Sequence, residues 1–149
     1  MKTQNNTNNT IYFHFHEINI FPFPESLFRK WILFLIHNEQ KILGDINVIF
    51  VSDQYLYEMN VSYLKHDYLT DVITFNYGNS ENNIVSGDIF ISIDRISENS
   101  QINRLPFLNE LLRIIFHGVL HLIGYDDKNN DDKHIMTAKE DYYLQKCKF

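Results

Sequence analysis

Two histidines, a glycine and an aspartate follow one another at regular spacing in FHGVLHLIGYDD, residues 116–127. His117 and His121 are four residues apart, Gly124 follows three residues later, and Asp127 three residues after that. On a helix, side chains four residues apart lie over each other with Cβ atoms about 5–6 Å apart, so both imidazoles can reach a single ion. Gly124 is a natural helix end, and the chain that turns back there can bring Asp127 to the same ion.

This donor set suits zinc, which accepts imidazole and carboxylate ligands. Three protein ligands leave a position open for water, as in a catalytic site. Two histidines on an apolar helix would otherwise each need a separate polar partner. We therefore predict one zinc ion per chain on His117, His121 and Asp127. His134 is the alternative third ligand, because the DDKNNDD run at 126–132 is also typical of a solvated loop.

Composition restricts the setting of this site. The 149 residues suit one domain, and the 44% that are hydrophobic can form a sizeable core. A single cysteine, Cys147, excludes an internal disulfide and agrees with a reducing cytoplasm. No apolar run is long enough to cross a membrane. The formal net charge of −6 argues against nucleic-acid binding by bulk charge, although a local groove or a bound cation can still attract RNA.

The elements that must position the metal ligands alternate along the chain. Hydrophobic periodicity predicts strands at 11–20, 43–52, 71–77 and 86–93. Helices are predicted at 26–40, 53–63 with Asp53 as N-cap, 94–100, 107–124 and 131–145.

These elements predict an α+β fold, a single domain over residues 11–149 with a mixed four-stranded sheet packed with helices. The helix at 107–124 is apolar around most of its circumference, so we expect it to be the central, metal-binding helix. Residues 1–10 are polar and lack the apolar centre of a signal peptide, which predicts a disordered tail.

Three segments resemble a known family. HGVLHLIGYDD at 117–127 is similar to the H-G-x-L-H-L-x-G-Y-D-H signature of the YbeY family, bacterial metal-dependent endoribonucleases that mature ribosomal RNA. MNVSYLKHDYLTDVITF at 59–75 resembles the family's L-N-x-x-Y-R-x-x-D-x-x-T-D-V-L-S-F segment, and SGDIFIS at 86–92 resembles its G-D-I-x-I-S strand. The order and spacing of the three segments match, and together they span about residues 45–145.

The resemblance implies a compact α+β domain with zinc bound by the signature. It implies hydrolysis of single-stranded RNA near the 3′ end of small-subunit ribosomal RNA, and a role in ribosome quality control. The implied partners are ribosomal RNA and ribosomal proteins of the small subunit, in the cytoplasm and without a membrane.

Two residues depart from the family pattern. Asp127 stands where the family has its third histidine, and a carboxylate should make a bound water less acidic and favour harder ions such as manganese. Leu64 stands where the family has an arginine thought to face the substrate phosphate. Lys65 and His66 follow directly, and we predict that one of them contacts the phosphate instead.

Gly118 occupies the position at which a zinc protease carries its catalytic glutamate. Peptide hydrolysis needs a proton carried to the leaving amine, and glycine cannot carry one. The glycine therefore argues against a protease, and it can give substrate or a neighbouring strand close access to the helix. We expect Thr70 and Asp71 to shape the cleft, and His134 is a candidate proton carrier.

Two other functions remain open at this stage. The chain could be a non-catalytic ribosome assembly factor with a structural metal, which the negative charge and the missing arginine favour. It could also be another metal-dependent hydrolase, in which Glu58 or Asp71 activates the water.

Overall fold

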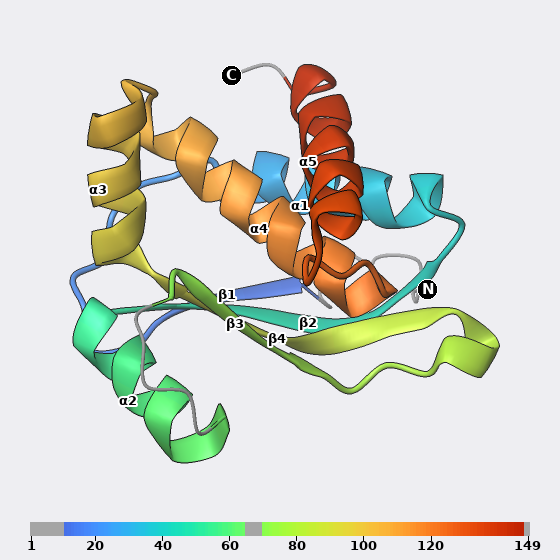
Figure 1. The fold of residues 1–149 in the computed structure, drawn as a ribbon, viewed down its shortest axis with the longest axis horizontal. Coiled ribbons are helices and arrows are strands. Elements are labelled where there is room, and N and C mark those ends of the chain that lie inside the picture. The colour runs from blue at the N-terminus through green and yellow to red at the C-terminus, as the bar shows by residue number, and fades with distance from the viewer. Residues whose placement is uncertain (1–10, 65–69, 148–149) are drawn as a thin grey trace, which may run out of the picture.

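A four-stranded sheet with helices on both faces organises the protein (Figure 1). The structure is a computed structural model, and it describes residues 11–64 and 70–147. Helices α1, α3, α4 and α5 lie on one side of the sheet, and α2 lies on the other (Figure 1). The tail predicted for residues 1–10 lies outside the described residues and stays a prediction.

The sheet is mixed, as the sequence predicts. Its order is β1-β2-β4-β3, with β1, β2 and β4 parallel and β3 antiparallel to β4 at one edge. The parallel neighbours are joined by crossover connections that carry helices, as parallel pairing requires. The strands are β1 Ile11–Phe15, β2 Ile42–Val51, β3 Val72–Asn76 and β4 Ile84–Ser92.

Five α-helices lie in the described part of the chain, and the α+β prediction is confirmed. They are α1 Glu25–Asn38, α2 Asp53–Leu64, α3 Ile93–Asn103, α4 Phe107–Ile123 and α5 Asn130–Gln145.

The first strand is shorter than predicted. It ends at Phe15 because the backbone turns at Glu17, which has a positive φ of 58°. The aromatic residues that continue the alternation pack from irregular chain instead. Phe21 lies 5.3 Å from Phe50 between ring centroids, and Phe23 lies 5.5 Å from the same ring. The alternation of apolar and polar residues in this segment therefore reflects the burial of the aromatic side chains and not pairing with a neighbouring strand.

The predicted N-cap of α2 is also wrong by one residue. The hydroxyl of Ser52, not the carboxylate of Asp53, accepts the capping hydrogen bond from Tyr55 N at 3.1 Å. Asp53 turns toward α3 instead, where its carboxylate accepts from Ser92 Oγ at 3.2 Å and pairs with Arg95. The local sequence cannot show which of two adjacent residues caps a helix when one of them instead contacts a residue far away in the sequence.

Two further elements differ in extent from the predictions. Helix α3 runs three residues past the predicted end and stops where Arg104 adopts a left-handed conformation with φ 57°. The segment between the predicted strands at 71–77 and 86–93 contains one turn of 3₁₀ helix, η2 Ser80–Asn82, which Asn79 caps by accepting hydrogen bonds from two backbone N–H groups. Neither difference changes the sheet.

Helix α4 is the centre of the hydrophobic core, as predicted. It packs on β3 and β4 and against α1, α3 and α5. It buries nine apolar positions, namely Leu111, Leu112, Ile114, Ile115, Phe116, Gly118, Val119, Leu120 and Leu122. Within the described ranges, none of the helices has the length and apolar character needed to span a membrane.

Gly87 of β4 leaves no room for a side chain. A Cβ at this position would lie 2.4 Å from the carbonyl oxygen of Phe75 in the neighbouring strand. Gly87→Ala should therefore lower the free energy of unfolding by about 1–3 kcal/mol, which corresponds to roughly 2–4 °C in Tm per kcal/mol for a chain of this size. Thermal unfolding followed by circular dichroism measures the change.

Gly118→Ala is the matched control. Its Cβ would meet Ile89 Cγ2 at 2.7 Å, a side-chain atom and not the backbone, and the helix gains about 0.5–1 kcal/mol from alanine. The loss at Gly118 should therefore be the smaller one. A larger loss at Gly118 than at Gly87 would contradict this ranking.

Candidate metal centre

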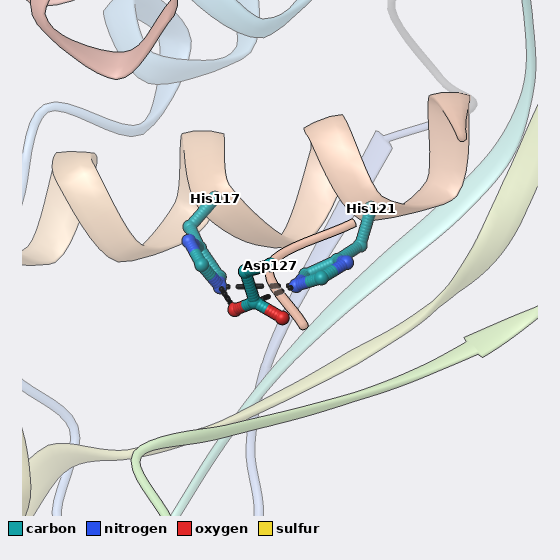
Figure 2. Close-up of side chains that lie close together, drawn as sticks. All are labelled: His117, His121 and Asp127. Atoms are coloured by element: carbon teal, nitrogen blue, oxygen red, sulfur yellow. Dashed lines mark hydrogen bonds and ion pairs between the residues drawn. The ribbon is translucent and has the colours of Figure 1, made fainter. Parts of the chain in front are cut away.

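Three side chains converge below the C-terminal half of α4 (Figure 2). His117 Nε2 lies 3.1 Å from His121 Nε2 and 3.2 Å from Asp127 Oδ2, and His121 Nε2 lies 3.4 Å from the same oxygen. In the described part of the chain, these three residues form the group of donors close enough to hold one ion. The predicted trio is therefore brought together.

The spacing of the three donor atoms fits a small divalent cation. Ligands bound to zinc at about 2.0–2.1 Å in tetrahedral directions lie about 3.3 Å from one another. The observed separations of 3.1–3.4 Å agree with that value. All three side chains are partly exposed, between 18% and 40%, so one side of the donor triangle faces solvent. That openness is typical of a site that also takes water or substrate.

A tight turn brings Asp127 back to the histidines. Helix α4 ends at Ile123, and Gly124 adopts a φ of 128°, which strongly favours glycine. Its N–H donates to the carbonyl oxygens of His121 and Leu120, both at 3.1 Å. The helix cap and the ligand spacing are thus two properties of the same local sequence.

A largely buried carboxylate directly after α1, that of Glu39, holds this turn in place. Glu39 Oε1 accepts a hydrogen bond from the hydroxyl of Tyr125 at 2.6 Å, and Oε2 accepts from Lys139 at 3.0 Å and from the hydroxyl of Tyr143. Burial alone would raise the pKa of Glu39, but these hydrogen bonds outweigh it and lower the pKa. The carboxylate therefore stays charged and joins α1, α5 and the ligand turn.

The three-donor cluster lies in a cleft of about 390 Å³ that borders the edge strand β3. Thr70 and Asp71 both line it, as expected from the sequence. Leu64 also lines it, at the position where the YbeY pattern has arginine, so this wall of the cleft is apolar here. The lining residues are Asn60, Leu64, Thr70, Asp71, Val72, Ile73, Thr74, His117, His121 and Asp127.

Gly118 faces the sheet and not the cleft. Its absent side chain allows Ile89 of β4 to approach α4, since a Cβ would lie 2.7 Å from Ile89 Cγ2. Of the two uses predicted for this glycine, close access for a neighbouring strand is the one observed. A glutamate at this position would have to enter the core.

The other predicted site residues have different positions. His134 is exposed on α5 and is not part of the donor cluster of the described residues. Glu58 is exposed on α2, where it accepts a hydrogen bond from Gln54, and it does not line the cleft. Lys65 and His66 lie outside the described residues, so their predicted phosphate contact stays a prediction.

Charge around His117 is balanced by carboxylates. Burial would lower the pKa of His117, but the hydrogen bond and charge of Glu140, together with Asp127 and Asp71, raise it above 6.5. Burial raises the pKa of Asp71 above 3.8, against the opposing effect of the charge of His117. The surroundings of His117 therefore favour positive charge at the metal centre.

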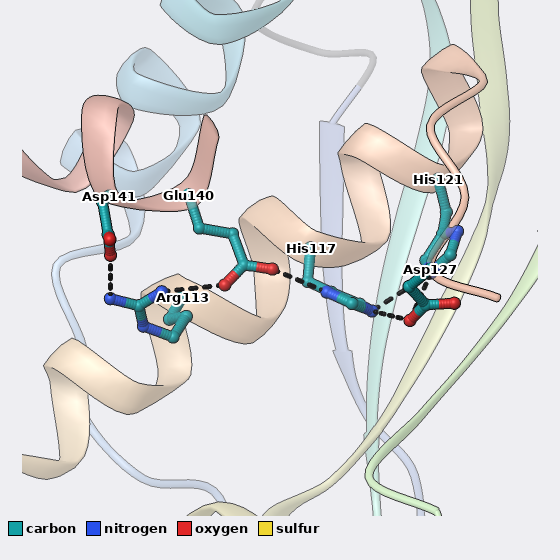
Figure 3. Close-up of polar contacts among 6 residues, drawn as sticks. All are labelled: Arg113, His117, His121, Asp127, Glu140 and Asp141. Atoms are coloured by element: carbon teal, nitrogen blue, oxygen red, sulfur yellow. Dashed lines mark hydrogen bonds and ion pairs between the residues drawn. The ribbon is translucent and has the colours of Figure 1, made fainter. Parts of the chain in front are cut away.

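Sequence reasoning missed two residues that contact this centre indirectly. Glu140 and Arg113 form a chain of polar contacts that reaches His117 from the side opposite Asp127 (Figure 3). A signal for Glu140 exists in the sequence, because it lies at helical spacing between Met136 and Tyr143, both buried. A charged residue within a buried stripe needs a partner.

Comparison with known protein families shows to which family the chain belongs. The family model described as Endoribonuclease YbeY matches residues 14–148. The chain belongs to the YbeY family. This membership confirms the resemblance drawn from the three sequence segments.

Relatives in the YbeY family cover most of the chain. The YbeY endoribonuclease of Karelsulcia muelleri is 48% identical over 131 residues, which are 88% of this chain and 92% of that protein. The YbeY endoribonuclease of Flavobacterium johnsoniae is 44% identical over 117 residues, 78% of this chain and 83% of that protein. A solution structure of a Thermotoga maritima protein matches with a TM-score of 0.62 and 25% identity, and covers 91% of this chain and 87% of that one.

Elemental analysis of purified protein tests the donor set. The wild-type chain should carry about one divalent ion, and Asp127→Ala should lose it, because two imidazoles alone hold a metal weakly. His134→Ala is the matched control and should retain the ion. Metal retained in Asp127→Ala and lost in His134→Ala would transfer the third ligand to His134.

Proposed function

We propose that the chain is a metal-dependent endoribonuclease that hydrolyses single-stranded RNA, at the 3′ end of small-subunit ribosomal RNA, and acts in ribosome maturation and quality control in the cytoplasm. The observation that carries this proposal is the three-donor cluster at an open cleft. Membership of the YbeY family, whose described relatives are named endoribonucleases, supports RNA as the substrate.

His117, His121 and Asp127 would hold one zinc ion. A bound zinc ion supplies a coordinated water with a pKa near 7 and positive charge beside the reacting phosphate. The chain's own contribution is to orient the three donors and to keep the outer side of the donor triangle open to substrate. Asp71, the residue before β3, lines the cleft beside the donors, and its carboxylate can accept a proton.

The cleft itself offers a phosphate little positive charge. Leu64 is apolar, and the acidic side chains Asp71 and Asp127 are both in the lining. The ion is therefore the main attraction for the phosphate, with Lys65 or His66 as the proposed additional contact. This arrangement agrees with the net charge of −6 and with RNA binding that depends on the metal.

Cleavage of a short single-stranded RNA, with the sequence of the 3′ end of small-subunit ribosomal RNA, tests the proposal. Cleavage should stop when a chelator is added and resume when zinc or manganese is restored. His117→Ala and His121→Ala should each lower the rate at least about 100-fold, because several kcal/mol of transition-state stabilisation depend on the metal. Product sizes on a denaturing gel provide the measurement.

His14→Ala is the control for this experiment. His14 is an exposed histidine of β1 that hydrogen-bonds Asn47 at 2.8 Å, away from the metal centre, so the variant should cleave at the wild-type rate. Cleavage that survives in both ligand variants would contradict the proposed site. A wild-type chain that binds RNA or ribosomal proteins but never cleaves would favour the assembly-factor function, which the apolar Leu64 also supports.

Leu64→Arg tests how much RNA-cleaving activity the chain loses by having leucine where the family has arginine. The side chain lines the cleft, so an arginine there can reach a bound phosphate. We expect kcat/KM to rise about tenfold, equivalent to about 1.4 kcal/mol. Tyr63→Arg is the matched control, because Tyr63 is 71% exposed and does not line the cleft. An equal gain in both variants would indicate bulk charge and not a positioned contact.

A further inference from the structure

Glu140 of α5 lies between two residues of α4 (Figure 3). Its Oε2 accepts a hydrogen bond from His117 Nδ1 at 2.7 Å, and its Oε1 accepts one from Arg113 Nη1 at 2.8 Å. Arg113 and His117 are four residues apart, so they lie on the same face of α4. One carboxylate therefore contacts both residues.

Burial of this carboxylate is unfavourable for the stability of the fold. Glu140 is 6% exposed and occupies the buried stripe of α5 between Met136 and Tyr143. A buried ion pair seldom stabilises a protein more than a well-packed apolar side chain of similar size. Packing of α4 against α5 does not by itself explain an acidic residue at this position.

Arg113 holds the carboxylate in its orientation. Its guanidinium uses Nη1 for Glu140 and Nη2 for Asp141, the latter at 2.6 Å. Both contacts come from the rigid fork of one guanidinium, which a lysine ammonium cannot reproduce. Arg113 therefore fixes the side-chain rotamer of Glu140, and the other carboxylate oxygen, Oε2, points at His117.

We propose that Glu140, held by Arg113, is a positioning residue that orients His117 for metal binding. By accepting the Nδ1–H, it leaves the lone pair of Nε2 directed at the point shared by His121 and Asp127. This inference rests on the proposed metal site and adds a residue to it. Carboxylate or carbonyl partners of this kind generally fix the tautomer and ring orientation of metal-binding histidines.

The contact is specific to one of the two histidines. Among residues 11–64 and 70–147, the polar side-chain contacts of His121 are with His117 and Asp127. Removal of the Glu140 charge should therefore weaken the metal site through one ligand only. The expected loss is smaller than that caused by removing a ligand.

Glu140→Gln is the test, because it keeps the size of the side chain and removes its charge. The zinc affinity, measured by competition with a chromophoric chelator, should fall about 10- to 100-fold. The visible absorption spectrum of the Co²⁺-loaded protein should also change, since glutamine has one acceptor oxygen in place of two and cannot accept from both Arg113 and His117. Far-ultraviolet circular dichroism should match the wild type.

Glu110→Gln is the matched control. Glu110 lies on α4 and is 8% exposed, so it is as buried as Glu140, and no hydrogen bond or ion pair joins its side chain to a metal ligand among the described residues. Its zinc affinity and Co²⁺ spectrum should equal those of the wild type. Arg113→Lys leaves Glu140 in place but removes the guanidinium fork, and should lower the affinity less than Glu140→Gln.

The outcomes separate this inference from the proposed function. Zinc affinity within twofold of the wild type in Glu140→Gln, with an unchanged Co²⁺ spectrum, would overturn the positioning role and leave the metal site intact. A wild-type chain that binds no zinc or Co²⁺ would overturn both. If Glu140→Gln does not fold, Arg113→Lys provides the test, and an unchanged affinity and spectrum there would overturn the role.

Discussion

The proposed metal centre depends on the path of the chain between His121 and Asp127. Gly124 reverses the chain with a φ of 128°, and the hydroxyl of Tyr125, one residue on, is held by Glu39, the residue that caps α1. The position of Asp127 therefore follows from a contact between segments 86 residues apart in sequence. A local turn gives the direction of the chain, and a partly buried hydrogen bond fixes the turn relative to the core.

Electrostatics around His117 follow from the same packing. Asp127 lies on one side of the imidazole at 3.2 Å and Glu140 on the other at 2.7 Å. These carboxylates raise the pKa of His117 despite burial, which by itself acts in the opposite direction. A proton and a metal cation meet the same negative surroundings, so the raised pKa and the proposed metal site have one cause.

The cleft combines this centre with the open edge of the sheet. Strand β3 is the edge strand beside α4, and no strand of the described residues pairs with its outer side. Leu64 and Asp71 line the cleft at the two ends of the segment that precedes β3. With an apolar and an acidic residue at these positions, the cleft depends on a bound cation to attract a phosphate.

The sequence by itself determined the helix that carries the two histidines and the spacing of the proposed ligands, because the helical repeat places residues four apart on one face wherever the helix packs. It also determined the order of strands and helices, and with the family segments it indicated the fold. Only the tertiary structure decided that Glu140 meets His117, that Gly118 faces β4, and that Leu64 faces the cleft. These facts depend on how each element is rotated about its axis when it packs against another. That rotation is set by contacts between distant residues, which local spacing does not encode.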